Sequence, residues 1–416
     1  MTKVEKSVEI TKVGISSGDN NERDLEEPSK PELVYNYDPE RRNLAMEYTR
    51  ASRIYSFKLL VLSLGVSGII LLSKISVMLN DFIIENISEN PIIVVGLFFL
   101  IGYILLGLVE LPFSFYSHIH FGKKYGLSKL NNRQWFFRHL KGEILGFSLS
   151  LIIFEGFYWI LREVKSTWWV WATILMVGFS IILSALIPVL ILPIFYKFES
   201  LEKTHPELTK DLLDLANQAG FKTKNVFNWK LGAVATVGNA ALMGLGSTRR
   251  VVISDTMLNQ YTNEEIKWIL AHELGHHVHH DLWKHIITGT ISTFIMFYIT
   301  NILFIQLSAI LGYPSDISSV ATLPVIGLSF WMVSEVLINV PSLWLSRRDE
   351  KSADGYACEV IPNKIVVKSL FIKMADQNLA DINPPWWERI FYLSHPPIET
   401  RIADSLNQIE KNNIEI

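Results

Sequence analysis

Residues 271–280 read AHELGHHVHH and place five histidines and one glutamate within ten positions. His272, Glu273 and His276 form the pattern H-E-x-x-H. On a helix, positions i and i+4 lie on the same face, so the two imidazoles can bind one metal ion while the glutamate lies beside it. Gly275 has no side chain, so another segment can approach this helix closely. The stretch predicts a catalytic metal site on a helix.

The flanking residues favour a helix around this pattern. Thr262 and Glu265 have the spacing of a capping box, and no proline interrupts the residues that follow. The plain alternative is a solvent-facing helix that carries several histidines. That alternative does not explain why the apolar Ala271, Leu274 and Val278 alternate with the histidines on a second face. We therefore favour the metal-binding interpretation.

The overall composition indicates a membrane protein. The chain has 416 residues, of which 49% are hydrophobic, and its mean hydropathy is +0.26. An ordinary soluble domain of this length is less apolar. The net charge of −3 provides no basic surface for nucleic acid, so we expect no nucleic-acid partner. The single cysteine, Cys358, excludes an intrachain disulfide and a four-thiolate zinc site.

Apolar and polar stretches divide the chain. Residues 1–45 are polar and charged and cannot bury enough apolar area to offset the entropy of ordering, so we expect a disordered tail. We expect membrane helices in 46–195 and 286–345, a small polar domain in 196–285 and a C-terminal segment in 346–416. Six apolar stretches each have about the ~20 residues that a helix needs to cross a bilayer, and they lie near 57–79, 92–114, 144–161, 168–195, 286–312 and 319–345.

The distribution of basic residues predicts the orientation of these spans. The loop 80–91 has three acids and no base, whereas the loop 115–142 has six lysines and arginines. Because basic loops stay in the cytoplasm, 115–142 is expected to be a basic cytoplasmic loop. With six spans, both termini and both polar segments then lie on the cytoplasmic side.

A catalytic zinc ion keeps three protein ligands and one open position for water, so one further ligand is required. The segment SRRDEKSADGYA follows the sixth span directly. We choose Glu350 as the third ligand, because two crossings separate it from His276 and return the chain to the same side. Asp354, one turn later, is expected to hydrogen-bond a ligand histidine. The alternative is a charged helix end that anchors at the lipid headgroups.

The other histidines of this region are not expected to bind the metal. They are His277, His279, His280 and His285. His280 lies one turn beyond His276, so we expect it to lie next to a ligand and to support it.

Several segments together resemble the integral-membrane zinc metallopeptidases of the CAAX prenyl protease 1 type, the Ste24-like branch of the M48 peptidases. They occur in the order of that family and are ELPFSFYSHIHFGKKYGLS, LPIFYKFESLE, GNAALMGLGSTRRVVISDTML, HELGHH, SRRDEKSAD and SHPPIETRI. The resemblance implies one zinc ion per chain, held by His272, His276 and Glu350. It also implies a mainly α fold: a polytopic membrane bundle of about six helices enclosing a chamber, with a small cytoplasmic α+β zincin-like catalytic domain that includes an edge strand.

The resemblance assigns further residues. Asn239 and the adjacent Ala240 match the start of the edge strand that pairs with an extended substrate. His395 matches a histidine that stabilises the developing oxyanion, and Arg401 matches an arginine close to the site. Without the resemblance, each residue has an equally good plain interpretation. Asn239 can be a turn residue, His395 a loop residue before two prolines, and Arg401 a surface charge.

We therefore expect a membrane-embedded zinc metalloendopeptidase in which Glu273 is the general base and His395 assists catalysis. The expected partners are the lipid bilayer and a peptide or protein substrate bound as an added strand, either prenylated or inserted in the membrane. One alternative is an HtpX-like quality-control peptidase, and another is a non-catalytic transporter or scaffold with a structural zinc. The expected location is the plasma membrane of a prokaryote or the endoplasmic reticulum of a eukaryote, with the site at the cytoplasmic face.

Overall fold

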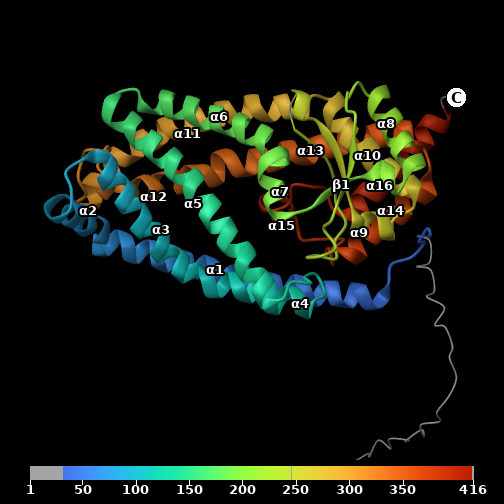
Figure 1. Ribbon diagram of the computed structural model, residues 1–416, viewed down its shortest axis with the longest axis horizontal. Helices are drawn as coiled ribbons and strands as arrows, with labels where there is room; N and C mark the ends of the chain where they lie inside the picture. Colours follow the sequence, from blue (N-terminus) through green and yellow to red (C-terminus); the bar gives the residue numbers. More distant parts are fainter. Residues whose placement is uncertain (1–30, 245, 415–416) are drawn as a thin grey trace, which may run out of the picture. The chain divides into compact units, whose positions relative to one another are not determined.

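In a computed structural model, residues 31–244 and 246–414 are described, and within them the chain is mainly helical (Figure 1). Long apolar helices form one part. A four-stranded sheet with shorter helices forms the other. This agrees with the expected class of a membrane helical bundle that carries a small α+β domain.

Five helical stretches among the described residues are long and apolar enough to cross a membrane. A sixth is counted if the bent pair Val320–Ser334 and Leu337–Val360, with a 46° bend, is one span. The other five are Pro39–Ser73 (α1), Pro91–Lys124 (α3, Pro91–Phe115, continued through a π-helix into α4, Gly122–Lys124), Asn132–Glu163 (α5), Trp168–Phe195 (α6, Trp168–Leu186, to α7, Leu192–Phe195) and Asp281–Leu311 (α11). The expected number of about six spans is therefore confirmed.

The interior of the bundle is held together by apolar packing. Trp168 and Leu161 are fully buried there, and Phe304 and Val325 pack in the same cluster. By contrast, many Leu, Ile and Phe side chains of the same helices are exposed on the outside. This distribution fits lipid as the surrounding solvent, because lipid does not penalise exposed apolar side chains. The expected enclosed chamber stays a prediction.

Two expected boundaries near the N-terminus are wrong. The disordered tail was expected to reach residue 45, but α1 begins at Pro39, where the Asp38 side chain caps it by accepting from the backbone N–H of Glu40 and Arg41. Residues 1–30 lie outside the described part. The first span was expected at 57–79, but α1 ends at Ser73 because Lys74 adopts the left-handed conformation, and a separate helix, α2 (Ile75–Asn86), follows.

The sheet has the strand order β1-β2-β4-β3. Its strands are Phe198–Ser200 (β1), Val226–Trp229 (β2), Ala240–Met243 (β3) and Arg250–Ser254 (β4). β4 pairs in parallel with β2 and antiparallel with β3, so Ala240 lies opposite Ile253 and Met243 opposite Arg250. β3 is consequently an edge strand, with one side unpaired within the sheet. Helices α8 (Pro206–Gln218) and α9 (Asp255–Gln260) flank this part.

The H-E-x-x-H pattern lies on α10, Asn263–Val278, as expected. The predicted capping box is present: the backbone N–H of Glu265 donates to the Thr262 hydroxyl, and the backbone N–H of Thr262 donates to the Glu265 carboxylate at 2.7 Å. Gly275 permits the expected close approach. A Cβ at this position would lie 2.8 Å from the Cα of Ala353 on α13 (Val340–Val360), so α10 and α13 pack backbone to backbone here.

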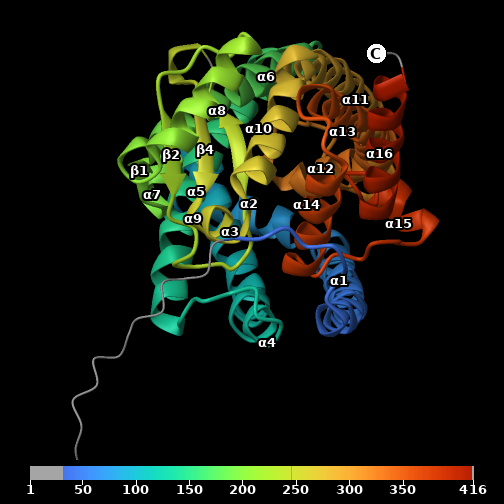
Figure 2. The same cartoon turned by 90° about the vertical axis from the view of Figure 1, so that its right-hand side faces the viewer.

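The last helices of the chain are α12 (Leu323–Ser334), α13 (Val340–Val360), α14 (Lys364–Gln377), α15 (Trp386–Phe391) and α16 (Ile398–Ile414). α13 packs against α10, α15 and α16, and α14 packs against α10 and α16. Figure 2 shows α14, α15 and α16 on the far side of α10 from the sheet. A shared apolar core joins α8, α10, α14 and α16, and it includes Leu212, Trp268, Phe371 and Ile409. The helix that carries H-E-x-x-H is thus fixed from several sides.

Candidate metal centre and catalytic site

The side chains of His272, His276 and Glu350 converge on one point. One ligand atom from each of the three lies within 4.8 Å of the others. The Nε2 atom of His272 is 3.4 Å from Oε2 of Glu350, and the Nε2 atom of His276 is 3.5 Å from Oε1. Two successive turns of α10 supply the imidazoles, and α13 supplies the carboxylate. The two crossings between His276 and Glu350 therefore bring both helices together, as expected.

A carboxylate orients each of these histidines by contacting its Nδ1 atom, on the side of the ring away from the common point. The Nδ1 atom of His272 lies 2.8 Å from Oδ1 of Asp354, the partner that the spacing predicted. The Nδ1 atom of His276 lies 2.8 Å from Oδ2 of Asp281. A carboxylate at Nδ1 holds the proton there, so both Nε2 lone pairs face the common point.

Sequence reasoning missed Asp281 and proposed His280 for this position. His280 is exposed and has a φ of 57°, in the break between α10 and α11, whereas Asp281 is 3% exposed and begins α11. The sequence does contain an acidic residue five positions after His276, and this could have indicated a hydrogen-bond partner for that histidine.

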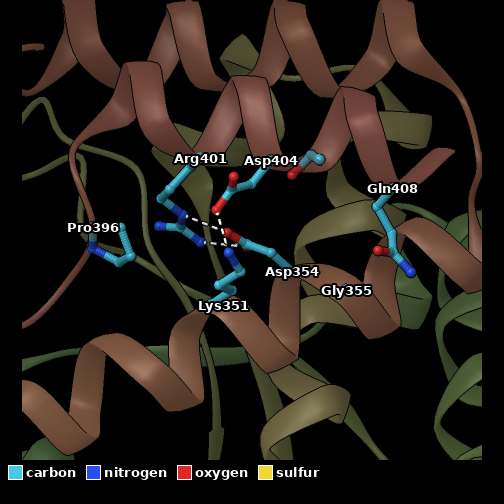
Figure 3. Close-up of a pocket in the computed structure, with 8 residues that line it drawn as sticks. Lys351, Asp354, Gly355, Pro396, Arg401, Asp404 and Gln408 are labelled. Carbon is cyan, nitrogen blue, oxygen red and sulfur yellow. Dashed lines mark hydrogen bonds and ion pairs between the residues drawn. The ribbon is translucent and has the colours of Figure 1, made fainter. Parts of the chain in front are cut away.

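Arg401 on α16 supports the site through Asp354 (Figure 3). Its Nε donates to Oδ2 of Asp354 at 2.8 Å and its Nη2 to Oδ1 at 2.6 Å, which is a bidentate pair. Nη2 also lies 3.4 Å from Oε2 of Glu350. Arg401 is 6% exposed, so the surface-charge interpretation is wrong. The guanidinium fixes the carboxylate that in turn fixes His272.

The donor set fits a divalent transition metal. Oε2 of Glu350 is buried and makes no short hydrogen bond among the described residues, because Nε2 of His272 and Nη2 of Arg401 each lie 3.4 Å away. A buried carboxylate oxygen with such loose contacts can accept a cation. Two imidazole nitrogens and one carboxylate oxygen match the three-ligand set of a catalytic zinc site. Burial by itself lowers the pKa of His272, but its hydrogen bonds to Asp354 and Glu350 outweigh burial and raise the pKa to about 9. At neutral pH the metal-free His272 therefore carries a proton that a bound metal ion would displace.

Glu273 lies between the metal centre and the edge strand. Its carboxylate accepts a hydrogen bond from the backbone N–H of Leu242 on β3. Burial raises its pKa, and the neighbouring His272 and His276 offset this only in part. A carboxylate with a raised pKa is a better proton acceptor near neutral pH.

Asn239 and Ala240 lie where the edge strand begins. The backbone N–H of Asn239 donates to the Ser254 hydroxyl, and its carbonyl accepts from the Ser254 backbone N–H, both at 2.8 Å. The Asn239 side chain is exposed. Ala240 is the first residue of β3, two positions before the Leu242 that contacts Glu273. An extended chain paired with β3 would therefore pass the metal centre.

His395 lies in the loop between α15 and α16 and reaches the metal centre. Its Nε2 atom is 3.1 Å from Oε1 of Glu350, and its side chain is 57% exposed. The Ser394 hydroxyl lies 2.8 Å from its Nδ1. The imidazole therefore borders the site on the solvent side, where a reacting carbonyl would enter.

The remaining histidines of this region lie outside the three-ligand cluster in the part of the chain that is described. The Nε2 atom of His285 is 3.0 Å from Oδ2 of Asp349, and Lys284 approaches the same carboxylate. Asp349 therefore points toward the start of α11 and not toward the metal centre, although it precedes Glu350 directly.

Two family models match consecutive parts of the chain. The CAAX prenyl protease N-terminal region, described by five membrane helices, matches residues 23–197. Peptidase family M48 matches residues 202–409, which is half of the chain. The second match contains every residue of the metal centre, and the boundary between the two lies close to the point where the membrane helices give way to the sheet.

Individual proteins are similar over most of the chain. The uncharacterized metalloprotease YhfN of Bacillus subtilis is 27% identical over 88% of this chain and 85% of its own length. CAAX prenyl protease 1 of Saccharomyces cerevisiae is 28% identical over 73% of this chain and 71% of its own. The fold is similar to the crystal structure of S. mikatae Ste24p, with a TM-score of 0.75, 24% identity, and coverage of 91% of this chain and 92% of that one. The chain therefore belongs to peptidase family M48 and is a multi-pass membrane metalloprotease of the Ste24-like kind.

Proposed function

We propose that this chain is a zinc endopeptidase in which one zinc ion is bound by His272, His276 and Glu350, and Glu273 is the general base. The observation that carries the proposal is the convergence of both Nε2 atoms on Glu350, with Glu273 between them and an edge strand. A structural zinc site has no use for a general base, so the transporter or scaffold alternative is disfavoured. When bound, zinc supplies a Lewis acid and lowers the pKa of a coordinated water toward ~7.

The residues around the metal centre then have three roles: proton transfer, hydrogen bonding to the substrate, and positioning of a ligand. Glu273 accepts the proton of the attacking water and delivers it to the leaving amine. His395, at the solvent side, donates a hydrogen bond to the oxygen of the scissile carbonyl as negative charge develops on it. Asp354 acts through His272, because it contacts the Nδ1 side of that ring and not the open side. Arg401 holds Asp354 in place and also lies 3.4 Å from Oε2 of Glu350.

We propose that the substrate is bound as an added strand along β3, beginning near Asn239 and Ala240. Support comes from the edge position of β3 and from the contact between Leu242 and Glu273. Strand addition is based on main-chain hydrogen bonds, so it tolerates many side chains. Selectivity among substrates must then depend on which peptides can reach β3.

The substrate class is proposed from the relatives. One relative is named CAAX prenyl protease 1, which favours C-terminal peptides of prenylated proteins. The HtpX-like alternative, a quality-control peptidase for damaged membrane proteins, uses the same catalytic residues. A matched pair of peptides, with and without a prenyl group, separates these alternatives: only the first predicts a large preference for the prenylated one.

We propose that the catalytic site is at the cytoplasmic face, in the plasma membrane of a prokaryote or the endoplasmic reticulum of a eukaryote. The basic loop 115–142 and the acidic loop 80–91 support this orientation. We assign 39–195 and 286–345 to the membrane part, because α1 begins at Pro39, and 196–285 and 346–416 to the catalytic part.

The test is Glu273→Gln, with Glu264→Gln on the same helix as the matched control. Glu264 lies in an exposed ion pair with Lys267 and is remote from the metal centre. Glu273→Gln should retain one zinc per chain by elemental analysis and lose activity by about 10²–10⁴-fold. The control should behave as wild type. Wild-type protein that holds zinc but cleaves no peptide, or a Glu273→Gln variant with full activity, would overturn the proposal.

A further inference from the structure

The short helix α15, Trp386–Phe391, and the residue after it expose an unusual aromatic surface. Trp386 is 69% exposed and Tyr392 is 68% exposed. Trp387, Ile390 and Phe391 are also exposed. A soluble surface rarely presents so many large apolar side chains on seven residues, so this surface marks an interaction site.

Contacts with two membrane helices, α1 and α13, indicate the depth of α15 relative to the bilayer. On α1, Arg53 pairs with Glu388 of α15 and lies 3.0 Å from Asp381. Arg53 and Lys58 are the last two charged residues before the apolar part of α1. On α13, Arg347 donates to the carbonyl of Leu393 at 2.7 Å, just after the exposed Trp344.

Along both α1 and α13, the side chains change from apolar to charged close to the contact with α15 or with Leu393 just after it. Such a change marks the depth at which a bilayer's hydrocarbon core ends. Two helices therefore independently place α15 at this depth. Figure 2 shows α15 at the rim of this part of the chain, beside α16.

We propose that α15 and Tyr392 bind the headgroup layer of the bilayer and anchor the loop that carries His395. Tryptophan and tyrosine favour this layer because they combine an apolar ring with a polar group. On α1, Ile54 and Phe57 follow Arg53 closely and are 50% and 66% exposed, so exposed apolar side chains continue from α15 along the start of the span. This continuity favours lipid over a protein partner.

The anchor has a consequence for the catalytic loop. Only two residues separate Tyr392 from His395, and Arg347 holds the intervening Leu393. The headgroup layer therefore holds the loop against Glu350 and keeps the open side of the metal centre close to the membrane surface. This part rests on the proposed role of His395, whereas the lipid contact itself does not.

Depth-dependent quenching tests the lipid contact without any activity measurement. Full-length Cys358→Ala protein in vesicles carries a single bimane-labelled cysteine at Tyr392, at Leu64 on the exposed face of α1, or at Lys210 on α8. Lipids brominated close to the headgroup should quench Tyr392→Cys more than lipids brominated deep in the chain. Leu64→Cys should show the reverse order, and Lys210→Cys should respond only to iodide in the water.

The proposal is overturned if the probe at Tyr392 responds only to iodide, as at Lys210, or to neither quencher, which would mean that protein covers it. A second measurement concerns the loop. The Trp386→Ser/Tyr392→Ser double variant should retain its zinc and lose activity toward a membrane-anchored peptide more than toward a soluble one, whereas Trp159→Ser, on the exposed face of α5, should not. Equal loss on both peptides contradicts the anchoring of the loop but leaves the quenching result, and the catalytic assignment, to stand separately.

Discussion

The imidazole of His276 and the carboxylate of Asp281 form a hydrogen bond of 2.8 Å across the break between α10 and α11. Oδ1 of the same carboxylate lies 2.7 Å from the ammonium of Lys284. Asp281 is the first residue of a membrane-spanning helix, so that helix helps to orient a residue of the metal centre. The two histidines of the H-E-x-x-H pattern thus have separate supports, Asp354 from α13 and Asp281 from α11.

Asp281→Ala should weaken metal binding by about 10–100-fold, because an unsupported imidazole loses its orientation and some of its basicity. Competition with a chromogenic chelator measures this affinity in purified protein. Asp211→Ala, which removes an exposed ion pair with Lys267, serves as the control and should bind as wild type. Equal affinities for the two variants would refute a supporting role for Asp281.

Glu350→Gln and Asp349→Asn should have different effects on metal content although the residues are adjacent. Glu350 points to both histidines, whereas Asp349 points to His285. Elemental analysis should find little zinc in Glu350→Gln and about one equivalent in Asp349→Asn. The opposite result would mean that the wrong carboxylate has been assigned as the ligand.

Metal binding should strengthen as the pH rises. The pKa of His272 in the metal-free site is raised to about 9, so at neutral pH this imidazole carries a proton that the metal must displace. Affinity should increase by about tenfold per pH unit for each proton released, and this dependence should flatten as the pH exceeds that pKa. Calorimetry in buffers of different ionisation enthalpy counts the released protons. An affinity that does not change between about pH 6 and about pH 8 contradicts the raised pKa.

Gly275→Ala and Gly355→Ala should change stability in opposite directions. A Cβ at Gly275 would lie 2.8 Å from the Cα of Ala353, so α10 and α13 must move apart, at a cost of about 1–3 kcal/mol. A Cβ at Gly355 meets nothing within 4 Å. Helix propensity then favours alanine there by up to about 1 kcal/mol. Thermal unfolding in detergent compares the two, and similar midpoints would contradict the close packing.

The orientation predicts which positions are accessible from the side opposite the cytoplasm. In a Cys358→Ala background, single cysteines at the exposed Glu89 and Ser315 should react with an impermeant thiol reagent added to intact cells that carry the protein in their plasma membrane. Cysteines at the exposed Lys129 and Lys210 should react only after the membrane is opened. The reverse pattern would place the catalytic site on the opposite face.

Some features of the site could be predicted because they depend on local pattern or on counting. The capping box needs only residues three positions apart, and an even number of crossings places the segment of Glu350 on the same side as His276. Asp281 could not be found this way. It reaches His276 because His280 adopts a left-handed conformation between two helices, and a continuous helix would point the same side chain elsewhere.

A tertiary contact also determines where the first span ends. Lys74 ends α1 early, and its ammonium donates to the carbonyl of Gly312 at 3.0 Å, which lies 238 residues later in the chain. The apolar run continues through this break, so hydropathy alone merges α1 with α2. Hydropathy measures transfer to lipid and carries no information about a partner so distant in sequence.

The passage of α13 from the bilayer into the metal centre has a consequence for biosynthesis. His272 and His276 are translated before two further spans, and Glu350 is translated after them. The nascent chain therefore has no complete binding site until both spans are inserted and the C-terminal half of α13 has left the ribosome. Asp354 and Arg401 follow later still. An unfinished chain consequently lacks the complete ligand set, so metal loading and proteolytic activity come only after both spans have been made.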